Sequence, residues 1–457
     1  MMATDARSIG TLAESREPET GSPGRVAVIG GGIAGLSSAH FLREAGAEVT
    51  LFESSDRFGG LGAYFEYDGL HLDKFYHVLQ PSDDELLPLL EAVGHSHEPY
   101  WREMSLGFYY DRELYPLGTP MDLLRFKPAV FSDRIRLGLT ALYAAYVAKP
   151  EPLDNITVGE WLSRVSGKRA FERLWKPLLI AKFGDAYEQI PALWYWASFN
   201  REKGTKQEVK GYVQGGYKGM TDAIVSSLRD RGVMLHLNSP VEHLDLDEER
   251  RPTLRVNGDT LAFDRVVLTV PLFFLNKMAG QGKLAEWLAR INTDIDYQGA
   301  VNVLVMTKRS LTKHYWLPVV NCGVPFDGIV ETTRVIDLDE TGGRHLVYLL
   351  NYVHRSTPLF NRDPNDVRDE YVKALLDLIP GLTRDDITDA MTFKTPFVEP
   401  LYTPGYAGRK PPFEWVPGRV YLATTTQVYP EVTSWNSSTI MARRAVEALL
   451  RTVRQPR

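Results

Sequence analysis

The sequence predicts an α/β protein with a parallel sheet in its first part. Three observations predict it: a short apolar strand over residues 25–29, a glycine cluster directly after it, and a second apolar strand over residues 48–52 that is followed by an acid. The segment between the strands has the length and apolar content of a helix. A strand, a glycine turn, a helix, a strand and an acid in this order form the G-x-G-x-x-G pattern of a Rossmann-type unit that binds a dinucleotide.

Each glycine of the pattern has a physical reason. Gly30 permits the tight turn after the first strand, and Gly32 lets a pyrophosphate approach the backbone. Gly35 lets the helix pack close to the strand. The helix begins near Ile33 and Ala34, and its free N–H groups and positive dipole end are expected to face the phosphates.

The acid after the second strand is Glu53, whose carboxylate can accept hydrogen bonds from both ribose hydroxyls. An acid at this position favours a free 2′-hydroxyl over a 2′-phosphate. Ser54 is placed in the same predicted cofactor site.

The residues after Glu53 indicate which dinucleotide is bound. Arg57, Gly59, Gly60, Leu61 and Gly62 resemble R-x-G-G-R, the second signature of FAD enzymes related to amine oxidases, phytoene desaturases and protoporphyrinogen oxidase. Here Leu61 replaces the final Arg of that motif. Arg57 can pair bidentately with a pyrophosphate, and the glycines let the backbone pass close to a flavin.

The resemblance extends over residues 25–450. Its sequence motifs are most similar to those of a bacterial, protoporphyrinogen oxidase-like branch. UDP-galactopyranose mutase is a more distant relative. It implies a Rossmann-type FAD-binding domain with a discontinuous α+β substrate domain, the amine oxidase or GR2-like architecture. The expected ranges are 25–80, 211–297 and 412–457 for the FAD-binding domain, and 81–210 and 298–411 for a substrate-binding domain with a helical cap. Residues 1–24 are polar and predict a disordered extension.

The same resemblance implies further cofactor contacts from distant segments. Val241 and Thr269 match strand positions of the family, and a strand, loop and helix over 418–450 would close the flavin site. We expect Thr426, Trp435 and Asn436 to contribute there, with Ser434 as the helix N-cap.

This sequence departs from the family pattern at three places. Thr424 to Gln427 replace the usual Gly-Asp, and the strand 300–306 has no Lys to lie near flavin N5. The aromatic pair that encloses an amine is not clearly present, since Tyr429 and Trp435 can equally be core residues. The last two departures weaken the prediction of an amine substrate.

The candidate catalytic residues are His77, Tyr76 and Lys182. The family passes the segment that contains Tyr76 and His77 beside the flavin, and a histidine titrates near neutral pH. A structural role remains open for His77, and Lys182 lies in the expected helical cap. No metal is predicted, because His95 and His97 lack an accompanying ligand set.

The leading functional hypothesis is an FAD-dependent oxidoreductase. It would remove hydride from a C–H next to N or O, or desaturate a carbon skeleton, in a small, apolar or sugar-containing substrate, with O₂ or another electron acceptor. One alternative is a non-redox, mutase-like flavin enzyme with clustered arginines for substrate phosphates, although Arg102, Arg112, Arg125 and Arg201 show no tell-tale spacing. The other alternative is a flavin-free binding protein of the same fold.

Composition and charge limit the possible classes of function and suggest a cellular compartment. The net charge of −6, with no long basic run, argues against nucleic acid. A single cysteine, Cys322, and no signal-peptide pattern suggest the cytoplasm. The amphipathic segment 129–149 carries cations and could lie on a membrane surface, but we favour a helix that faces the core.

Overall fold

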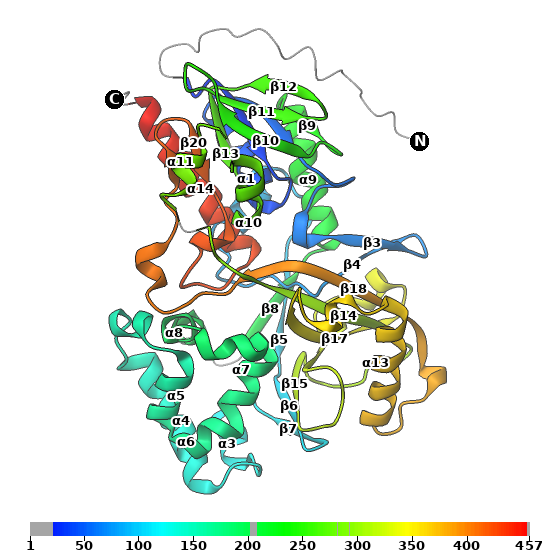
Figure 1. The fold of residues 1–457 in the computed structure, drawn as a ribbon. Helices are drawn as coiled ribbons and strands as arrows, with labels where there is room; N and C mark the ends of the chain where they lie inside the picture. Colours follow the sequence, from blue (N-terminus) through cyan, green and yellow to red (C-terminus); the bar gives the residue numbers. More distant parts are fainter. Residues whose placement is uncertain (1–21, 202–207, 281, 292, 455–457) are drawn as a thin grey trace.

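The computed structural model describes residues 22–201, 208–280, 282–291 and 293–454. A six-stranded sheet, which contains the first and the last described strands, has the order β19-β20-β13-β1-β2-β9 (Figure 1). Its strands are β1 (Arg25–Ile29), β2 (Glu48–Phe52), β9 (Met234–His236), β13 (Arg265–Leu268), β19 (Glu414–Val416) and β20 (Val420–Leu422). β1 pairs in parallel with both β2 and β13, as the predicted Rossmann-type unit requires.

The residues of β1 explain why it lies inside the sheet, because both of its faces are apolar and buried. Val26 and Val28 pack with one layer of helices, and Ala27 and Ile29 pack with a small sheet on the other face. The helices are α1 (Ile33–Glu44), α9 (Gly216–Asp230) and α14 (Trp435–Arg454). The small sheet comprises β10 (Val241–Leu246), β11 (Pro252–Val256) and β12 (Asp259–Ala262).

A second, seven-stranded sheet has the order β18-β14-β17-β16-β15-β6-β7. Its strands are β6 (Gly107–Tyr110), β7 (Glu113–Pro116), β14 (Tyr297–Thr307), β15 (Trp316–Val320), β16 (Gly328–Glu331), β17 (His345–His354) and β18 (Ile387–Pro400). Val301, Val303 and Val305 of β14 pack with residues of α13 (Pro364–Leu378). Because side chains alternate along a strand, Ala300 and Asn302 face the opposite side, where the cavity described below lies.

In the view of Figure 1 a helical layer lies below the six-stranded sheet and to the left of the seven-stranded sheet. It comprises α3 (Pro120–Arg125), α4 (Phe131–Tyr146), α5 (Val158–Ser166), α6 (Lys168–Ala170), α7 (Lys176–Phe183) and α8 (Ala192–Arg201). α4 was expected to face the core, and this prediction is wrong for most of its large side chains. It packs through Leu137, Thr140 and Ala144, while Phe131, Leu139 and other large apolar residues are exposed.

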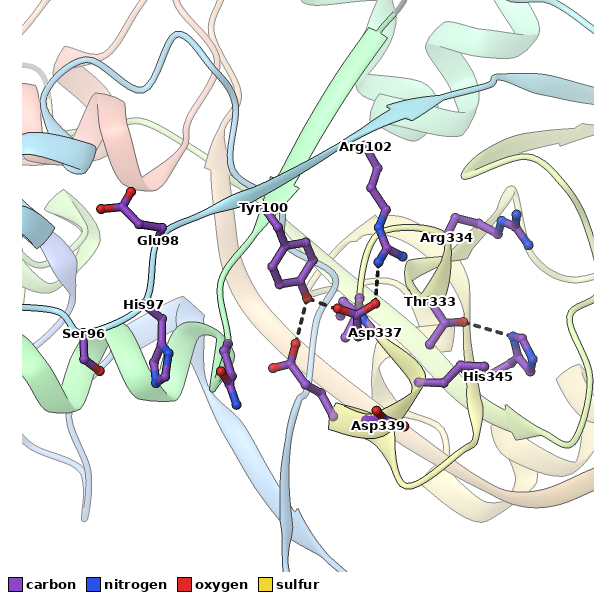
Figure 2. Close-up of a pocket in the computed structure, with 14 residues that line it drawn as sticks. Ser96, His97, Glu98, Tyr100, Arg102, Thr333, Arg334, Asp337, Asp339 and His345 are labelled. Carbon is purple, nitrogen blue, oxygen red and sulfur yellow. Dashed lines mark hydrogen bonds and ion pairs between the residues drawn. The ribbon is translucent and has the colours of Figure 1, made fainter.

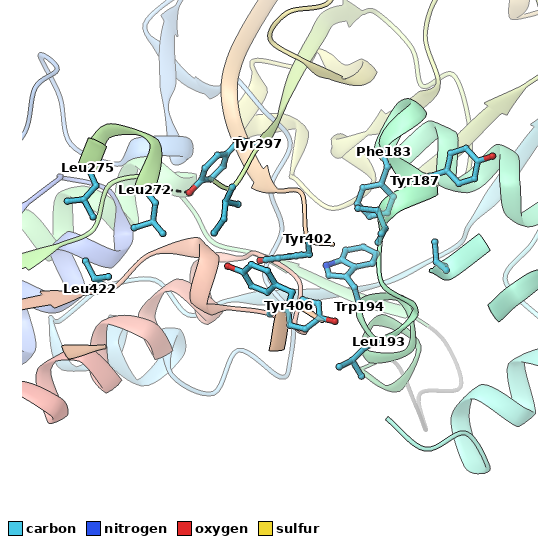
Figure 3. Packing of buried hydrophobic residues seen from close by; sticks show 14 of the residues in the cluster. Phe183, Tyr187, Leu193, Trp194, Leu272, Leu275, Tyr297, Tyr402, Tyr406 and Leu422 are labelled. Carbon is cyan, nitrogen blue, oxygen red and sulfur yellow. Dashed lines mark hydrogen bonds between the residues drawn. The ribbon is translucent and has the colours of Figure 1, made fainter. Parts of the chain in front are cut away.

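One apolar cluster joins the helical layer to the six-stranded sheet (Figure 3). Tyr402 and Tyr406 lie at its centre, with ring centroids 4.8 Å apart, and the cluster reaches Trp194 of α8 on one side and Leu422 of β20 on the other. Tyr297 belongs to the same cluster, and its hydroxyl accepts a hydrogen bond from the Leu272 N–H at 3.1 Å. The shared core therefore fixes the helical layer against the nucleotide-binding sheet.

The other elements connect these layers. They are the hairpin β3 (Tyr64–Tyr67) and β4 (Leu70–Asp73), the pair β5 (Tyr100–Met104) and β8 (Glu208–Tyr212), and the helices α2 (Leu86–Ala92), α10 (Leu272–Ala279), α11 (Ala285–Leu288) and α12 (Pro358–Asn361). Neither strand pair was predicted from the sequence. β5 and β8 are far apart in the chain and pair only in three dimensions.

The strands of each sheet come from separated segments of the chain, as the discontinuous two-domain division implies. Its boundaries stay a prediction. Residues 1–21 of the expected disordered extension lie outside the described residues. Order begins before residue 25, because the Gly24 carbonyl accepts a hydrogen bond from the Glu48 N–H at 3.0 Å.

The contact between α1 and β1 gives a first testable prediction. A Cβ atom on Gly35 would lie 1.8 Å from the Gly30 carbonyl oxygen, so Gly35→Ala must push the helix off the strand. We expect a loss of about 1–3 kcal/mol in unfolding free energy or more, together with reduced flavin content. Thermal unfolding and absorbance at 450 nm measure the two effects.

Gly408→Ala is the matched control, since a Cβ there meets nothing within 4 Å and its φ is not positive. Equal melting temperatures for the two variants would contradict the proposed tight packing.

Candidate active site

One cavity of about 940 Å³ connects the two sheets. At one end it is lined by the turn after β1 and by Glu53, and at the other by side chains of β14, β17 and β18. Fifteen residues singled out in the sequence line it: Gly30, Gly32, Ile33, Ala34, Glu53, Ser54, Gly59, Gly60, Leu61, Tyr76, His77, Lys182, Val241, Thr269 and Trp435. Gly35, Arg57, Gly62, Thr426 and Asn436 lie outside its lining.

The glycine turn is built by backbone contacts. Gly30 has a φ of +109°, a conformation that glycine adopts without strain, and its N–H donates to the Phe52 carbonyl at 2.9 Å. Gly32 is the N-cap of α1 and makes no side-chain capping hydrogen bond. The first N–H groups of a twelve-residue helix therefore border the cavity, where an anionic group would find donors and a positive dipole end.

Glu53 stands where β2 ends and holds this turn in place. Its Oε2 accepts a hydrogen bond from the Gly31 N–H at 2.6 Å, and its Oε1 accepts from the Ser55 N–H at 2.8 Å. The Ser54 hydroxyl also donates to Oε1 at 3.2 Å. A carboxylate oxygen has more than one lone pair, so these bonds leave capacity to accept from the hydroxyls of a ribose.

The second glycine motif packs directly on the first. The Gly59 N–H donates to the Gly31 carbonyl at 2.9 Å, and a Cβ on Gly60 would lie 2.9 Å from the Cα of Gly32. Gly62 instead makes room for the Trp435 ring, which a Cβ there would meet at 2.4 Å.

Arg57 lies outside this arrangement. Its guanidinium pairs with Asp56 at 2.9 Å and lies over the Tyr64 ring at 5.3 Å, on the protein surface. The geometry therefore does not support the predicted contact between Arg57 and a pyrophosphate.

The C-terminal segment closes the cavity at the start of α14. Ser434 caps this helix, as predicted, because its Oγ accepts from the Ser437 N–H at 3.0 Å. Thr425 lines the cavity, whereas Thr426 is buried and its hydroxyl lies 2.6 Å from that of Thr424. Asn436 caps a different helix: its Oδ1 accepts from two N–H groups at the start of α2, both at 2.9 Å.

These residues fit FAD in two independent respects. Glycine backbones, which side chains would otherwise fill, form a cradle beside the N-terminus of α1. A carboxylate lies at the end of the second strand, and the cavity continues past Val241 and Thr269 toward the second sheet. The adenosine, diphosphate and flavin parts of the cofactor can thus be bound along one continuous space.

Two of the three catalytic candidates meet on a residue that the sequence analysis missed. The hydroxyl of Tyr76 lies 2.7 Å from that of Tyr352, and the Nζ of Lys182 lies 4.5 Å from the centre of the Tyr352 ring. Lys182 also pairs with Glu399 at 3.1 Å. Burial raises the pKa of Tyr76 well above its usual value, so this tyrosine stays protonated and can donate a hydrogen bond.

His77 lines the same cavity and contacts different residues. Its Nδ1 lies 2.9 Å from the Phe75 carbonyl, which can only accept, so Nδ1 carries the hydrogen and Nε2 keeps its lone pair. Its ring packs on Tyr217, with centroids 4.7 Å apart. Burial lowers the pKa of His77 to about 4, so the imidazole is neutral at neutral pH and the lone pair on Nε2 is free.

Three buried polar atoms of the lining have no hydrogen-bond partner within the described residues: Asn302 Oδ1, Glu399 Oε1 and the Tyr315 hydroxyl. An unsatisfied buried polar atom is costly, so a water or a polar group of a bound molecule would stabilise each of these atoms. A second ion pair, Lys210 with Glu208 at 2.5 Å, also lines the cavity.

The missed residues share one reason. Asn302, Tyr352 and Glu399 come from β14, β17 and β18, which meet only through the register of the second sheet. The alternation of each strand predicts which residues share its own face, but no spacing in the sequence predicts the pairing between strands.

A second hollow of about 780 Å³ lies on the surface beside β5 (Figure 2). Its charged side chains are mostly paired with one another or with nearby hydroxyls. Arg102 pairs with Asp337, and the Tyr100 hydroxyl donates to Glu340 at 2.7 Å. It contains none of the residues predicted from the sequence to bind the cofactor or to act in catalysis, so we assign the site to the larger cavity.

The parallel sheet, the glycine cradle, the acid after the second strand and the adjoining cavity are the features of a dinucleotide-binding enzyme. The chain belongs to the flavin containing amine oxidoreductases, since the model of this family matches residues 33–448. It is therefore an FAD-dependent oxidoreductase of that family.

Known proteins agree with this assignment. A 4,4'-diapophytoene desaturase of Staphylococcus aureus (strain COL) is 25% identical over 290 residues, which cover 54% of this chain and 55% of the desaturase. The chain thus spans about half the length of that relative.

Solved structures show the fold. A protein from Exiguobacterium sp. 255-15, provisionally called protoporphyrinogen oxidase, has a TM-score of 0.74 at 16% identity, with 93% of this chain and 98% of that chain covered. Reduced UDP-galactopyranose mutase has a TM-score of 0.70 at 16% identity, with 94% and 97% covered. The predicted fold class and resemblance are confirmed.

The position of Glu53 yields the second prediction. Glu53→Gln removes the charge that binds ribose hydroxyls and steadies the glycine turn, so FAD affinity should fall about 10- to 100-fold. Titration of the apoprotein with FAD, followed by flavin fluorescence, measures the change. Glu48→Gln, an exposed residue at the other end of the same strand, should retain the wild-type affinity. Unchanged FAD binding in Glu53→Gln would remove this residue from the cofactor site.

Proposed function

We propose that the protein oxidises a small organic substrate at a C–H next to nitrogen or oxygen, and that O₂ or another acceptor then takes the electrons. The observation that supports this proposal is that one cavity contains both the dinucleotide cradle and the polar residues at its far end. FAD supplies the hydride acceptor when bound. The residues of the chain bind the substrate, exclude water and accept the proton.

The unsatisfied atoms favour a substrate with hydrogen-bond donors. Asn302 Oδ1 and Glu399 Oε1 can only accept, so each would be stabilised by an N–H or O–H group of the bound molecule or of a water. A pure hydrocarbon chain would offer a donor to neither atom. This supports oxidation beside nitrogen or oxygen over desaturation of a polyene.

The rest of the lining supports an apolar body for the substrate. Phe274, Met278, Phe397 and Val432 lie in the same cavity and present apolar side chains to it. Apolar side chains would exclude water from the reacting carbon and hold it in a fixed position.

His77 is proposed as the base. Loss of hydride from carbon leaves a cation unless the neighbouring N–H or O–H loses its proton, and the lone pair on neutral His77 Nε2 can take that proton. We propose that Tyr76 and Lys182 position the substrate, because both are bound to the ring or hydroxyl of Tyr352.

The mutase alternative has less support. Arginines that would bind a diphosphate are absent from the cavity lining within the described residues, where the cations are Lys182, Lys210 and Lys277. Arg102 and Arg112 are engaged elsewhere, by Asp337 and by the Cys322 carbonyl.

The reaction type is tested by anaerobic mixing of the oxidised holoenzyme with amines, alcohols and polyenes. We expect the flavin absorbance at 450 nm to bleach with a substrate that carries an N–H or O–H beside the reacting carbon, and to return on admission of air. Bleaching by polyenes alone would instead identify a desaturase. Turnover only after chemical pre-reduction, with no net redox change, would identify a mutase.

The role of His77 is tested by His77→Ala. The bleaching rate should fall about 10²- to 10⁴-fold while FAD stays bound, since a general base contributes about this much. His71→Ala is the control, because His71 is exposed on the neighbouring β4. A wild-type bleaching rate in His77→Ala would exclude this histidine as the base.

A further inference from the structure

Helix α4 carries large apolar side chains on its outer face. We define the α4 apolar face as Phe131, Ile135, Leu139, Leu142, Tyr146 and Val147, all of them exposed. Five of the six recur at the spacing of one helix face, and Val147 lies at its edge. Phe131 at one end is 67% exposed and Leu139 in the middle is 59% exposed, so this apolar surface is continuous along the helix. A contiguous exposed patch of this kind marks a contact surface.

Basic residues surround this face. Arg134 and Arg136 flank it on its two sides, and Arg125, Lys127 and Lys149 are exposed beyond its ends. The segment 120–173 contains nine Lys and Arg against six Asp and Glu, in a chain whose net charge is −6. The single acid of α4, Asp133, is buried and pairs with Arg169 at 2.6 Å. The local charge is therefore opposite in sign to that of the whole protein.

We propose that the α4 apolar face docks the protein onto the surface of a bilayer that contains anionic lipid. Apolar side chains with cations at their edges match an interface of acyl chains and negative headgroups. A second copy of the chain fits less well, because a two-fold contact would bring the same basic residues together.

The helix would lie parallel to the bilayer. No described helix has the length and apolar character needed to cross a membrane. α4 packs on α8, whose Trp194 ring lies 6.0 Å from the Nζ of Lys182 in the cavity lining. Docking would thus place the bilayer one helix layer from the cavity.

The test is sedimentation of the FAD-loaded protein with vesicles of phosphatidylcholine alone and of phosphatidylcholine with phosphatidylglycerol. We expect binding to the anionic vesicles that weakens with salt. The double variant Leu139→Gln/Leu142→Gln should lower the partition coefficient at least about tenfold, because it removes two exposed leucines from the contact. Its melting temperature and flavin content should not change, since both leucines are exposed.

Leu338→Gln is the matched control, since Leu338 is an exposed leucine in a short 3-10 helix outside α4 and should leave vesicle binding unchanged. Sedimentation equilibrium of the protein alone tests whether a second copy of the chain covers the α4 apolar face instead. A dimer that the double variant dissociates, without vesicle binding, would overturn the proposal. Absence of binding to anionic vesicles, or binding that the double variant retains in full, would also overturn it.

Discussion

The structure depends on one close backbone contact, between the turn after β1, the start of α1 and the loop that follows β2. Gly30, Gly32, Gly35 and Gly60 approach so closely that a Cβ on Gly35 or Gly60 would meet backbone atoms at 1.8 and 2.9 Å. With no side chains between them, the first N–H groups of α1 are left facing the cavity. The same absence of side chains gives the helix and strand the close packing on which the parallel sheet depends. Cofactor binding and fold stability therefore rest on the same atoms.

At the other end of the cavity the constraint is electrostatic. Lys182 is paired with Glu399, and Lys210 with Glu208, so these two lysines of the lining are held in neutral pairs. Burial also keeps His77 neutral by lowering its pKa. Such neutral groups suit a neutral or weakly basic substrate, because an unpaired buried charge would be costly. The acceptor atoms left unsatisfied then decide which hydrogen atoms of that substrate are bound.

The predictability of the site followed the distance between residues in the chain. The glycine turn and Glu53 could be predicted because strand, turn, helix and acid lie within about thirty residues and obey local rules. Tyr352 and Glu399 could not, because their place beside Lys182 depends on which strands pair and in which register. Asn436 was assigned to the cofactor from its place at the start of α14, but its side chain caps α2 instead.

The wrong prediction for α4 has a different physical origin. Amphipathic periodicity states that a helix has an apolar face, but not that the face is buried. The buried side of α4 is formed by Leu137, Thr140 and Ala144. This side packs against α5 and α8. The larger apolar side chains lie on the exposed side of α4, where only contact with another molecule or with a membrane would bury them. The cavity lining favours a substrate with an apolar part and a polar end, and a molecule of this kind partitions into the surface of a bilayer. Membrane docking through α4 and substrate binding in the cavity are therefore consistent with the same class of substrate.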